Sequence, residues 1–151
     1  QILTYDPASR SGGIDTAYLG GLVIDNSEAI LAGPWEFSQS TRPHVGNNYA
    51  HDGNKAKGMC SAIYKFKLDQ PGRYQVKLLW PGYENRASNV PIYIVADGSK
   101  LTLDLDQKKI TGQNGSIIAT VEAKKSLQVE VSNAGTEGFV IADAVQLMKL
   151  D

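Results

Sequence analysis

The sequence predicts an all-β fold, a β-sandwich of the jelly-roll type, on the basis of three observations. About eight to ten short segments alternate apolar and polar residues, as strands do. Turn-forming pairs such as Asp97-Gly98 and Asn114-Gly115 separate these segments. No stretch of useful length shows a helical period. Short strands divided by frequent turns indicate a sandwich or a barrel, whose functional residues lie in rim loops or on an exposed sheet face.

The expected strands follow one another with few residues between them. In chain order they are residues 21–25, 34–40, 60–68, 73–80, 91–98, 100–106, 116–123, 126–133 and 139–150. Alternation sends one row of each strand into the core. In two of the strands that row contains Leu101, Leu103 and Leu105, or Trp35 and Phe37. The aromatic residues expected in the core are Trp35, Tyr64, Phe66, Tyr74, Trp80 and Phe139.

The composition is that of an ordinary globular domain. The 151 residues suffice for one domain with a sizeable core, and 42% of them are hydrophobic. The formal net charge is −1, and no basic stripe indicates binding to nucleic acid or to an anionic membrane. No apolar run approaches the roughly 20 residues of a membrane span. The single cysteine, Cys60, falls in an inward row and is expected to be a buried, inert thiol.

The chain divides into two parts. Residues 1–20 have no clear period and are expected to be a linker or an N-terminal edge segment, while residues 21–151 form the β-sandwich domain. The sequence opens on Gln1 without a starting Met or a signal peptide, as expected of a mature chain or a fragment of a longer one.

Two long polar loops, residues 40–58 and 81–90, are the expected functional regions. The first contains His51-Asp52-Gly53-Asn54, which predicts a turn. Its alternative interpretation is a calcium site, because Asp52 and Asn54 offer oxygen ligands. The complete calcium-loop spacing is absent, and nothing at the spacing of zinc ligands accompanies the histidines. We therefore expect no cofactor and no metal, with calcium as the alternative.

Asp143 raises a separate question, because it stands in the apolar row of the last expected strand. A buried carboxylate without a partner is very costly. One candidate partner is Arg86, whose planar guanidinium pairs with carboxylates through two hydrogen bonds, and the other is His51. Such a pair would fix two loops to the last strand, and the same network could line a ligand groove.

The loop residues favour sugar binding over catalysis. A tyrosine ring can stack on the apolar face of a sugar while nearby amides and arginine bind its hydroxyls. The residues expected to bind ligand are Tyr49, His51, Tyr83, Asn85 and Arg86. The residues expected to form a structural polar network are Asp52, Asn54, Asn89, Asn133 and Asp143. No nucleophile with a base at a recognised spacing, and no phosphate-binding loop, predicts catalysis.

Three segments together resemble a known family: YAHDGNKAKGMCSAIY (49–64), PGRYQVKLLWPGYENRASNVPIYI (71–94) and VSNAGTEGFVIADAVQL (131–147). Their motifs are His-Asp-Gly-Asn, then Asn-Arg-Ala-x-Asn-Val-Pro, then Asn-Ala-Gly-Thr-x-Gly-x-Val-Ile-Ala-Asp-Ala-Val. They resemble the golvesin and xanthan lyase carbohydrate-binding-like domain over roughly residues 21–149.

The resemblance implies a non-catalytic β-sandwich near the C-terminus of a larger bacterial protein. That parent would be a polysaccharide lyase, a hydrolase or an FAD-dependent oxidoreductase-like protein, secreted, periplasmic or in the cell envelope. Its partners would be a polysaccharide and the catalytic domain of the same chain. The alternative is a structural or docking domain that packs on the catalytic domain and binds no sugar.

Overall fold

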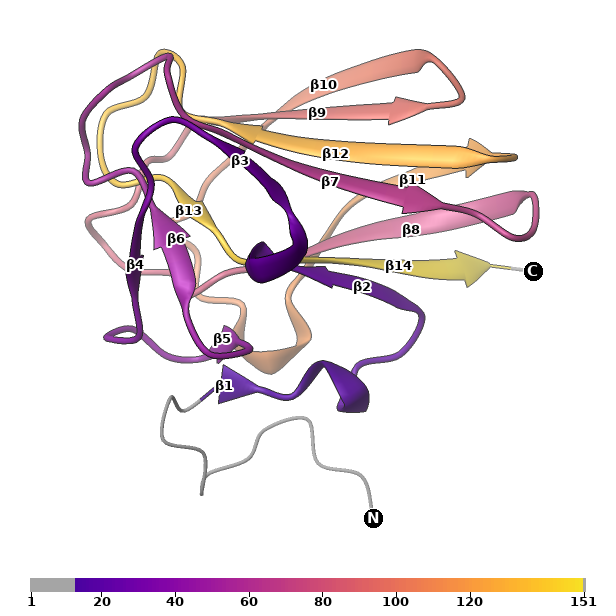
Figure 1. The fold of residues 1–151 in the computed structure, drawn as a ribbon, viewed down its shortest axis with the longest axis horizontal. Helices are drawn as coiled ribbons and strands as arrows, with labels where there is room; N and C mark the ends of the chain where they lie inside the picture. The colour runs from indigo at the N-terminus through magenta and orange to yellow at the C-terminus, as the bar shows by residue number, and fades with distance from the viewer. Residues whose placement is uncertain (1–12, 151) are drawn as a thin grey trace.

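Two antiparallel β-sheets stacked face to face dominate the computed structural model, which describes residues 13–150 (Figure 1). The five-stranded sheet has the order β10-β9-β12-β7-β3, and the four-stranded sheet has the order β11-β8-β14-β2. The first contains β3 (Ile30–Ala32), β7 (Ser61–Lys67), β9 (Val90–Ala96), β10 (Ser99–Leu105) and β12 (Ser126–Ser132). The second contains β2 (Leu22–Asp25), β8 (Gly72–Leu79), β11 (Ser116–Ala123) and β14 (Ala144–Leu150). The prediction of an all-β sandwich is confirmed.

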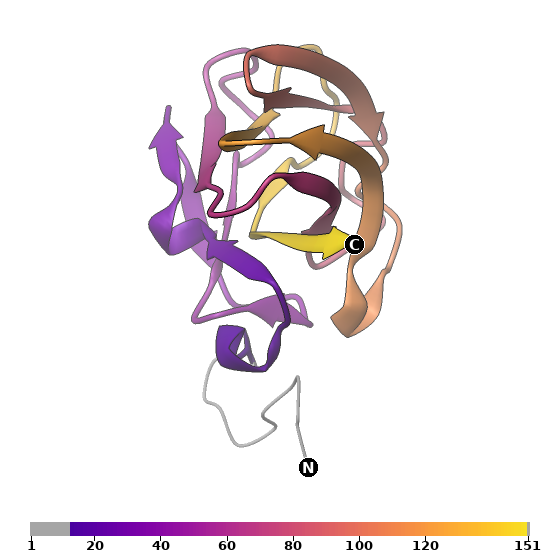
Figure 2. The ribbon, with the colours of Figure 1, turned by 90° about the vertical axis from the view of Figure 1, so that its right-hand side faces the viewer.

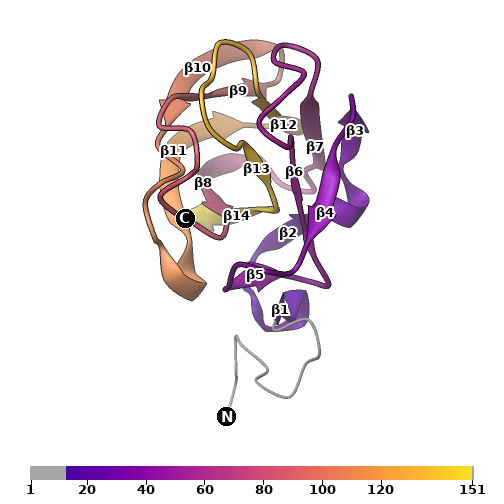
Figure 3. The ribbon, with the colours of Figure 1, turned by 90° about the vertical axis from the view of Figure 1, so that its left-hand side faces the viewer.

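Two smaller sheets complete one end of the sandwich. One has the order β13-β6-β4, and the other pairs β1 with β5 in parallel. The strands are β1 (Gly13–Ile14), β4 (Glu36–Ser38), β5 (His44–Val45), β6 (Tyr49–His51) and β13 (Ile141–Ala142). Three single turns of 3₁₀ helix are η1 (Thr16–Tyr18), η2 (Asn26–Glu28) and η3 (Gly112–Asn114). Figure 3 looks onto this end, where β4, β6 and β13 lie beside the connections between the large sheets.

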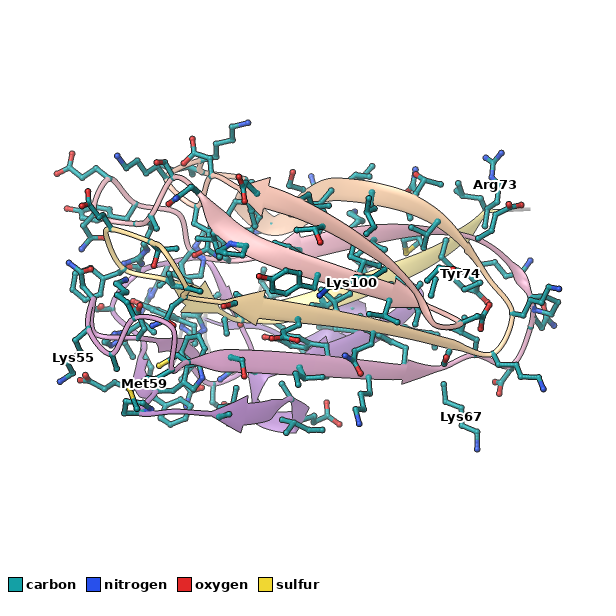
Figure 4. All side chains as sticks on the ribbon, turned by 90° about the horizontal axis from the view of Figure 1, so that it is seen from above. Lys55, Met59, Lys67, Arg73, Tyr74 and Lys100 are labelled. Atoms are coloured by element: carbon teal, nitrogen blue, oxygen red, sulfur yellow. The ribbon has the colours of Figure 1, made fainter. Side chains whose placement is uncertain are left out.

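The opposite end of the sandwich consists of hairpins. Figure 2 looks onto it, with the C-terminus in front. Seen from above in Figure 4, Lys67 and Arg73 mark the hairpin end, while Lys55 and Met59 mark the end with the small sheets. Loops that could shape a site therefore gather at one end, which we call the loop end.

The core lies between the two large sheets and follows the alternation of the sequence. Ala62, Tyr64 and Phe66 of β7 are buried, and so is Cys60, as predicted. The same pattern buries alternate residues of β8 and β12. Apolar side chains removed from water in this way supply most of the driving force for folding.

Two inward rows, both on edge strands, are only partly buried: Leu105 and Trp35 pack in or against the core as predicted, while Leu101 and Phe37 do not. Leu101 of β10 is 43% exposed and Leu103 is only half-buried, because β10 pairs with β9 alone at the edge of its sheet. Phe37 of β4 is 55% exposed, because β4 is the edge of the small sheet. Edge strands are covered by fewer neighbours, so period alone does not bury their rows.

Two expected segments are divided differently in the structure. The expected loop 40–58 contains β5 and β6, because short strands of two or three residues leave no periodic signal. The expected last strand, 139–150, breaks at Asp143 into β13 and β14, which belong to different sheets. Residues 140–147 are all buried because the segment is covered on both sides. Within residues 13–150, no helix is long and apolar enough to cross a membrane.

Gln107 connects this last segment to the loops. It is fully buried, and its side chain acts like a neighbouring strand, because Nε2 donates to the Ile141 carbonyl (2.8 Å) and Oε1 accepts from the Ile141 N–H (2.7 Å). Its own carbonyl accepts a hydrogen bond from Trp80 Nε1 (3.0 Å). One side chain thus satisfies both backbone groups of the buried Ile141.

We expect Gln107→Ala to lower the free energy of unfolding by about 3 kcal/mol, because it leaves both backbone groups of Ile141 buried without a partner. Urea unfolding measures the change. The control is Gln70→Ala, whose side chain is exposed and which should stay within about 0.5 kcal/mol of the wild type. Equal stability of the two variants would contradict the structural role of Gln107.

Candidate functional site

A groove of about 610 Å³ opens at the loop end of the molecule. It is lined by Ser38, Ser40, Thr41, Arg42, Tyr49, His51, Gly82, Tyr83, Asn85, Arg86, Ile110 and Phe139. All five residues expected from the sequence to bind ligand are in this lining, although they come from two distant segments. Their role in binding stays a prediction.

The backbone around Arg86 is fixed by Phe139. The Phe139 N–H donates to the Asn85 carbonyl, and the Ala87 N–H donates to the Phe139 carbonyl, both at 2.9 Å. The two stretches form a parallel bridge at Arg86. A Cβ at Gly138 would lie 2.9 Å from the carbonyl of Arg86, and the φ of Gly138 is +102°, so glycine is required there.

The guanidinium of Arg86 lies near two tyrosine rings, and the residue as a whole is only 5% exposed. Its Nε donates to the Pro81 carbonyl (3.1 Å), and Nη1 donates to Asn85 Oδ1 (2.9 Å). Its Cζ is 5.6 Å from the ring centroid of Tyr49 and 5.9 Å from that of Tyr83. Burial lowers the pKa of Arg86, and the neighbouring Tyr49 side chain acts in the opposite direction.

Tyr49 was expected in a loop but lies on β6, where it is 2% exposed. Its hydroxyl is 3.2 Å from Ser40 Oγ. Burial raises the pKa of Tyr49, but hydrogen bonds from Ser38, Ser40 and Thr41, together with the charge of Arg86, lower it to about 8. The polar end of the ring therefore faces a cluster of donors at the base of the groove.

His51 and Phe139 form the adjoining wall. Their ring centroids are 5.7 Å apart in an edge-to-face arrangement. His51 Nδ1 accepts a hydrogen bond from the Gly53 N–H (3.0 Å), which leaves Nε2 as the protonated nitrogen of the neutral ring. Across the groove, Tyr83 is 50% exposed and presents its ring to solvent.

Asp52 organises the polar cluster behind this wall and is fully buried. Its Oδ2 accepts from Lys57 Nζ (2.8 Å) and Asn133 Nδ2 (3.1 Å). Its Oδ1 accepts from the N–H groups of Val140 (3.0 Å) and Asn54 (2.9 Å). Burial alone would raise the pKa of Asp52, but Lys57 and the other donors outweigh it and lower that pKa.

Two further residues of the expected polar network connect neighbouring loops. Asn54 Oδ1 accepts from the Gly138 N–H (3.0 Å), and Asn89 Nδ2 donates to the Gly135 carbonyl (3.2 Å). Asn54 thus contacts the same cluster as Asp52, while Asn89 lies at its margin. Both carboxylate oxygens of Asp52 accept N–H donors in this structure. Calcium binding at this turn stays an alternative that the structure does not test.

The expected pairing of Asp143 with Arg86 or His51 is wrong. Asp143 Oδ2 accepts from the Val45 N–H (2.9 Å), and its side chain meets that of Asp25. The error arises because the expected single strand changes sheets at Asp143, which lies between β13 and β14. Asp143 therefore attaches β5 to the sandwich and takes no part in the groove.

Asp143 and Asp25 form a buried carboxyl pair. Burial raises the pKa of Asp143 well above its ordinary value, and the neighbouring Asp25 raises it further. The pKa of Asp25 is also raised by burial, although Ser27 donates to its carboxylate. Two carboxyls in contact can hydrogen-bond only through a shared proton, which we assign to Asp143. The Tyr64 hydroxyl donates to the Asp143 carbonyl (3.0 Å) and completes this attachment.

Several groove residues were not found from the sequence. Ile110, which is 77% exposed, and Arg42 and Ser40 belong to segments without a motif. Only the folding of three distant segments onto one end brings them beside Arg86. A smaller hollow of about 390 Å³ lies near Asp25, but no aromatic ring lines it, so it lacks the stacking surface of the groove.

The chain is similar in sequence to a known family and to a polysaccharide lyase. The family profile described as Golvesin C-terminal domain matches residues 22–149. Xanthan lyase of Bacillus sp. (strain GL1) is 29% identical over 138 residues, which are 86% of this chain and 15% of that protein. The chain therefore spans only a small share of that relative.

Solved structures also include a xanthan lyase that is similar to this chain. A Paenibacillus xanthan lyase superposes with a TM-score of 0.79 at 30% identity, over 85% of this chain and 13% of that one. A family 35 carbohydrate binding module from Clostridium thermocellum superposes with a TM-score of 0.59 at 12% identity, over 87% of this chain and 100% of the module. The second likeness is one of fold alone.

We expect one tyrosine to ionise with a midpoint near pH 8 and Tyr49→Phe to remove that step from a phenolate absorbance titration. Because the folded state releases this proton before the unfolded state does, the contribution of Tyr49 to stability should grow as the pH rises through about 8. If no tyrosine in the folded wild type ionises near pH 8, the donor cluster around Tyr49 is wrong.

We expect the Asp143→Asn variant to gain stability relative to the wild type as the pH rises from about 5 to about 8. The pKa of Asp143 is raised in the folded state, so its stabilising contribution is lost as the pH rises above the unfolded value of 3.8. Asparagine stays neutral throughout. Urea unfolding across this range measures the difference.

Asp143→Ala is the control for that series. It removes the acceptor of the Val45 N–H and, because alanine is also neutral throughout, should stay about 1–3 kcal/mol less stable than Asp143→Asn at every pH. If the wild type instead becomes more stable relative to Asp143→Asn as the pH rises, Asp143 is ionised in the folded state.

Proposed function

The chain belongs to the Golvesin C-terminal domain family, as its three motifs predict, and on that premise we propose that it is a non-catalytic, carbohydrate-binding-like module. It holds a larger enzyme against a polysaccharide. Such tethering raises the local concentration of substrate without adding a chemical step.

The observation that carries the proposal is the groove at the loop end. Its lining combines one exposed ring and two half-buried rings with hydrogen-bonding side chains, which is the mixture that a sugar requires. Tyr83 offers a half-exposed ring for stacking, while Asn85 and His51 offer polar atoms for hydroxyl groups. The hydrogen bonds around Arg86 and Asp52 hold these groups on fixed backbone.

The chemistry of the groove supports binding rather than turnover. Its twelve lining residues include no Asp, Glu or Cys, so it holds neither a carboxylate pair nor a thiol nucleophile. The larger enzyme would be a polysaccharide lyase, a hydrolase or an FAD-dependent oxidoreductase-like protein, with its catalytic domain in the same chain. It would be secreted, periplasmic or bound in the cell envelope, and the xanthan lyases similar to this chain fit the first class.

A second candidate is a docking domain that packs on the parent catalytic domain without binding sugar. Met59 and Phe37 favour it, because they are 66% and 55% exposed. Exposed apolar side chains of this size are typical of contact surfaces when they gather into a patch. Deletion of the module from its parent would then lower the parent's stability in the absence of any glycan affinity.

Affinity electrophoresis through gels containing soluble polysaccharides, xanthan among them, tests the first proposal. We expect retardation of the wild type and about tenfold weaker binding by Tyr83→Ala, which corresponds to about 1.4 kcal/mol. Tyr18→Ala is the matched control, because Tyr18 is 41% exposed and lies outside the groove. Absence of retardation in every gel, or an equal loss in both variants, would reject the groove as a sugar site.

A further inference from the structure

The cation at the base of the groove has no carboxylate partner. Within residues 13–150, the ion pairs are Lys55–Glu36 and Lys57–Asp52, and neither involves Arg86. The groups that act on the charge of Arg86 are two tyrosines, and no Asp or Glu is among them. Arg86 is a buried residue, 5% exposed, and the hydrogen bonds of its guanidinium go to two neutral acceptors, the Pro81 carbonyl and Asn85 Oδ1.

Such an arrangement is costly in the unliganded protein. A buried charge is normally paired, because desolvation otherwise opposes folding. The effect is seen in the pKa of Arg86, which burial lowers. An anion bound in the groove would offset this desolvation cost. Because the guanidinium is already desolvated and positioned in the folded protein, binding does not incur that cost again.

The hydrogen-bond inventory of Arg86 leaves room for such an anion. Nε and Nη1 have partners, but Nη2 is buried and has none. The other charged or titratable groups of the lining are Arg42, His51 and the two tyrosines, and none is a carboxylate. The groove thus favours negative over positive ligands.

We propose that the groove recognises the carboxylate of an acidic sugar, such as a uronic acid residue, through the guanidinium of Arg86. This inference rests on the proposed function and names the class of glycan. Arginine suits the task because its planar fork matches a carboxylate. Nη2 is buried in the unliganded structure, so a side chain of the lining must move for the carboxylate to reach it.

The decisive test compares each acidic polymer with its neutralised form. Polygalacturonate, alginate and hyaluronan are titrated against the wild type by calorimetry, each beside its methyl ester, with dextran as a neutral glycan. We expect one or more acidic forms to bind at least about tenfold more tightly than the corresponding ester. We also expect that affinity to fall with added salt.

The outcomes separate this inference from the proposed function. Equal binding of acid and ester, or binding of dextran alone, would overturn the carboxylate inference and leave a sugar-binding module. Absence of binding to every acidic and neutral glycan would overturn both. An acid preference that stays equally strong in Arg86→Gln would also overturn the role of Arg86.

Two variants assign the effect to the groove. Arg86→Gln should lose the preference for acid over ester, while Arg73→Gln should keep it, because Arg73 is an exposed arginine at the hairpin end (Figure 4). Arg86→Lys keeps the charge but loses the fork, and we expect an intermediate preference. Should the Arg86 variants fail to fold, the comparison of acid with ester in the wild type still decides the question.

Discussion

The six residues 139–144 hold the loop end together, and the groove depends on them. Their backbone meets the side chains of Gln107, Asp52 and Tyr64, the loop around Arg86, and the small strand β6. Backbone groups buried here must all be satisfied, and each partner that satisfies one is thereby fixed in position.

This constraint explains why the groove can be rigid although it is built from loops. Arg86 is positioned by backbone hydrogen bonds to Phe139, and His51 lies on β6, which pairs with β13. Arg86 and His51 are therefore held by one hydrogen-bonded frame, which consists of residues 139–142 and the strand β6. Tyr83 is the contrast, because it is half-exposed and lies on none of the strands of that frame.

Alternation of apolar residues was enough to predict the two large sheets, as the buried rows of β7 and β8 illustrate. It failed on the edge strands β4 and β10, and on β5, which is too short to have a period. The five expected ligand residues do share a groove, because loop chemistry identifies polar and aromatic side chains. The partner of Asp143 could not be predicted, because it depends on where the last segment changes sheets.

Residues 139–144 lie near the C-terminal end of the sequence, and this position determines when the groove can form during synthesis. Chains emerge from the ribosome N-terminus first, and non-local strand pairs cannot form until the later partner has appeared. The tyrosines and Arg86 are made well before the segment that fixes them. The groove therefore comes into being only when the domain is almost complete, and a chain interrupted before residue 139 would carry every residue expected to bind sugar and yet have no site.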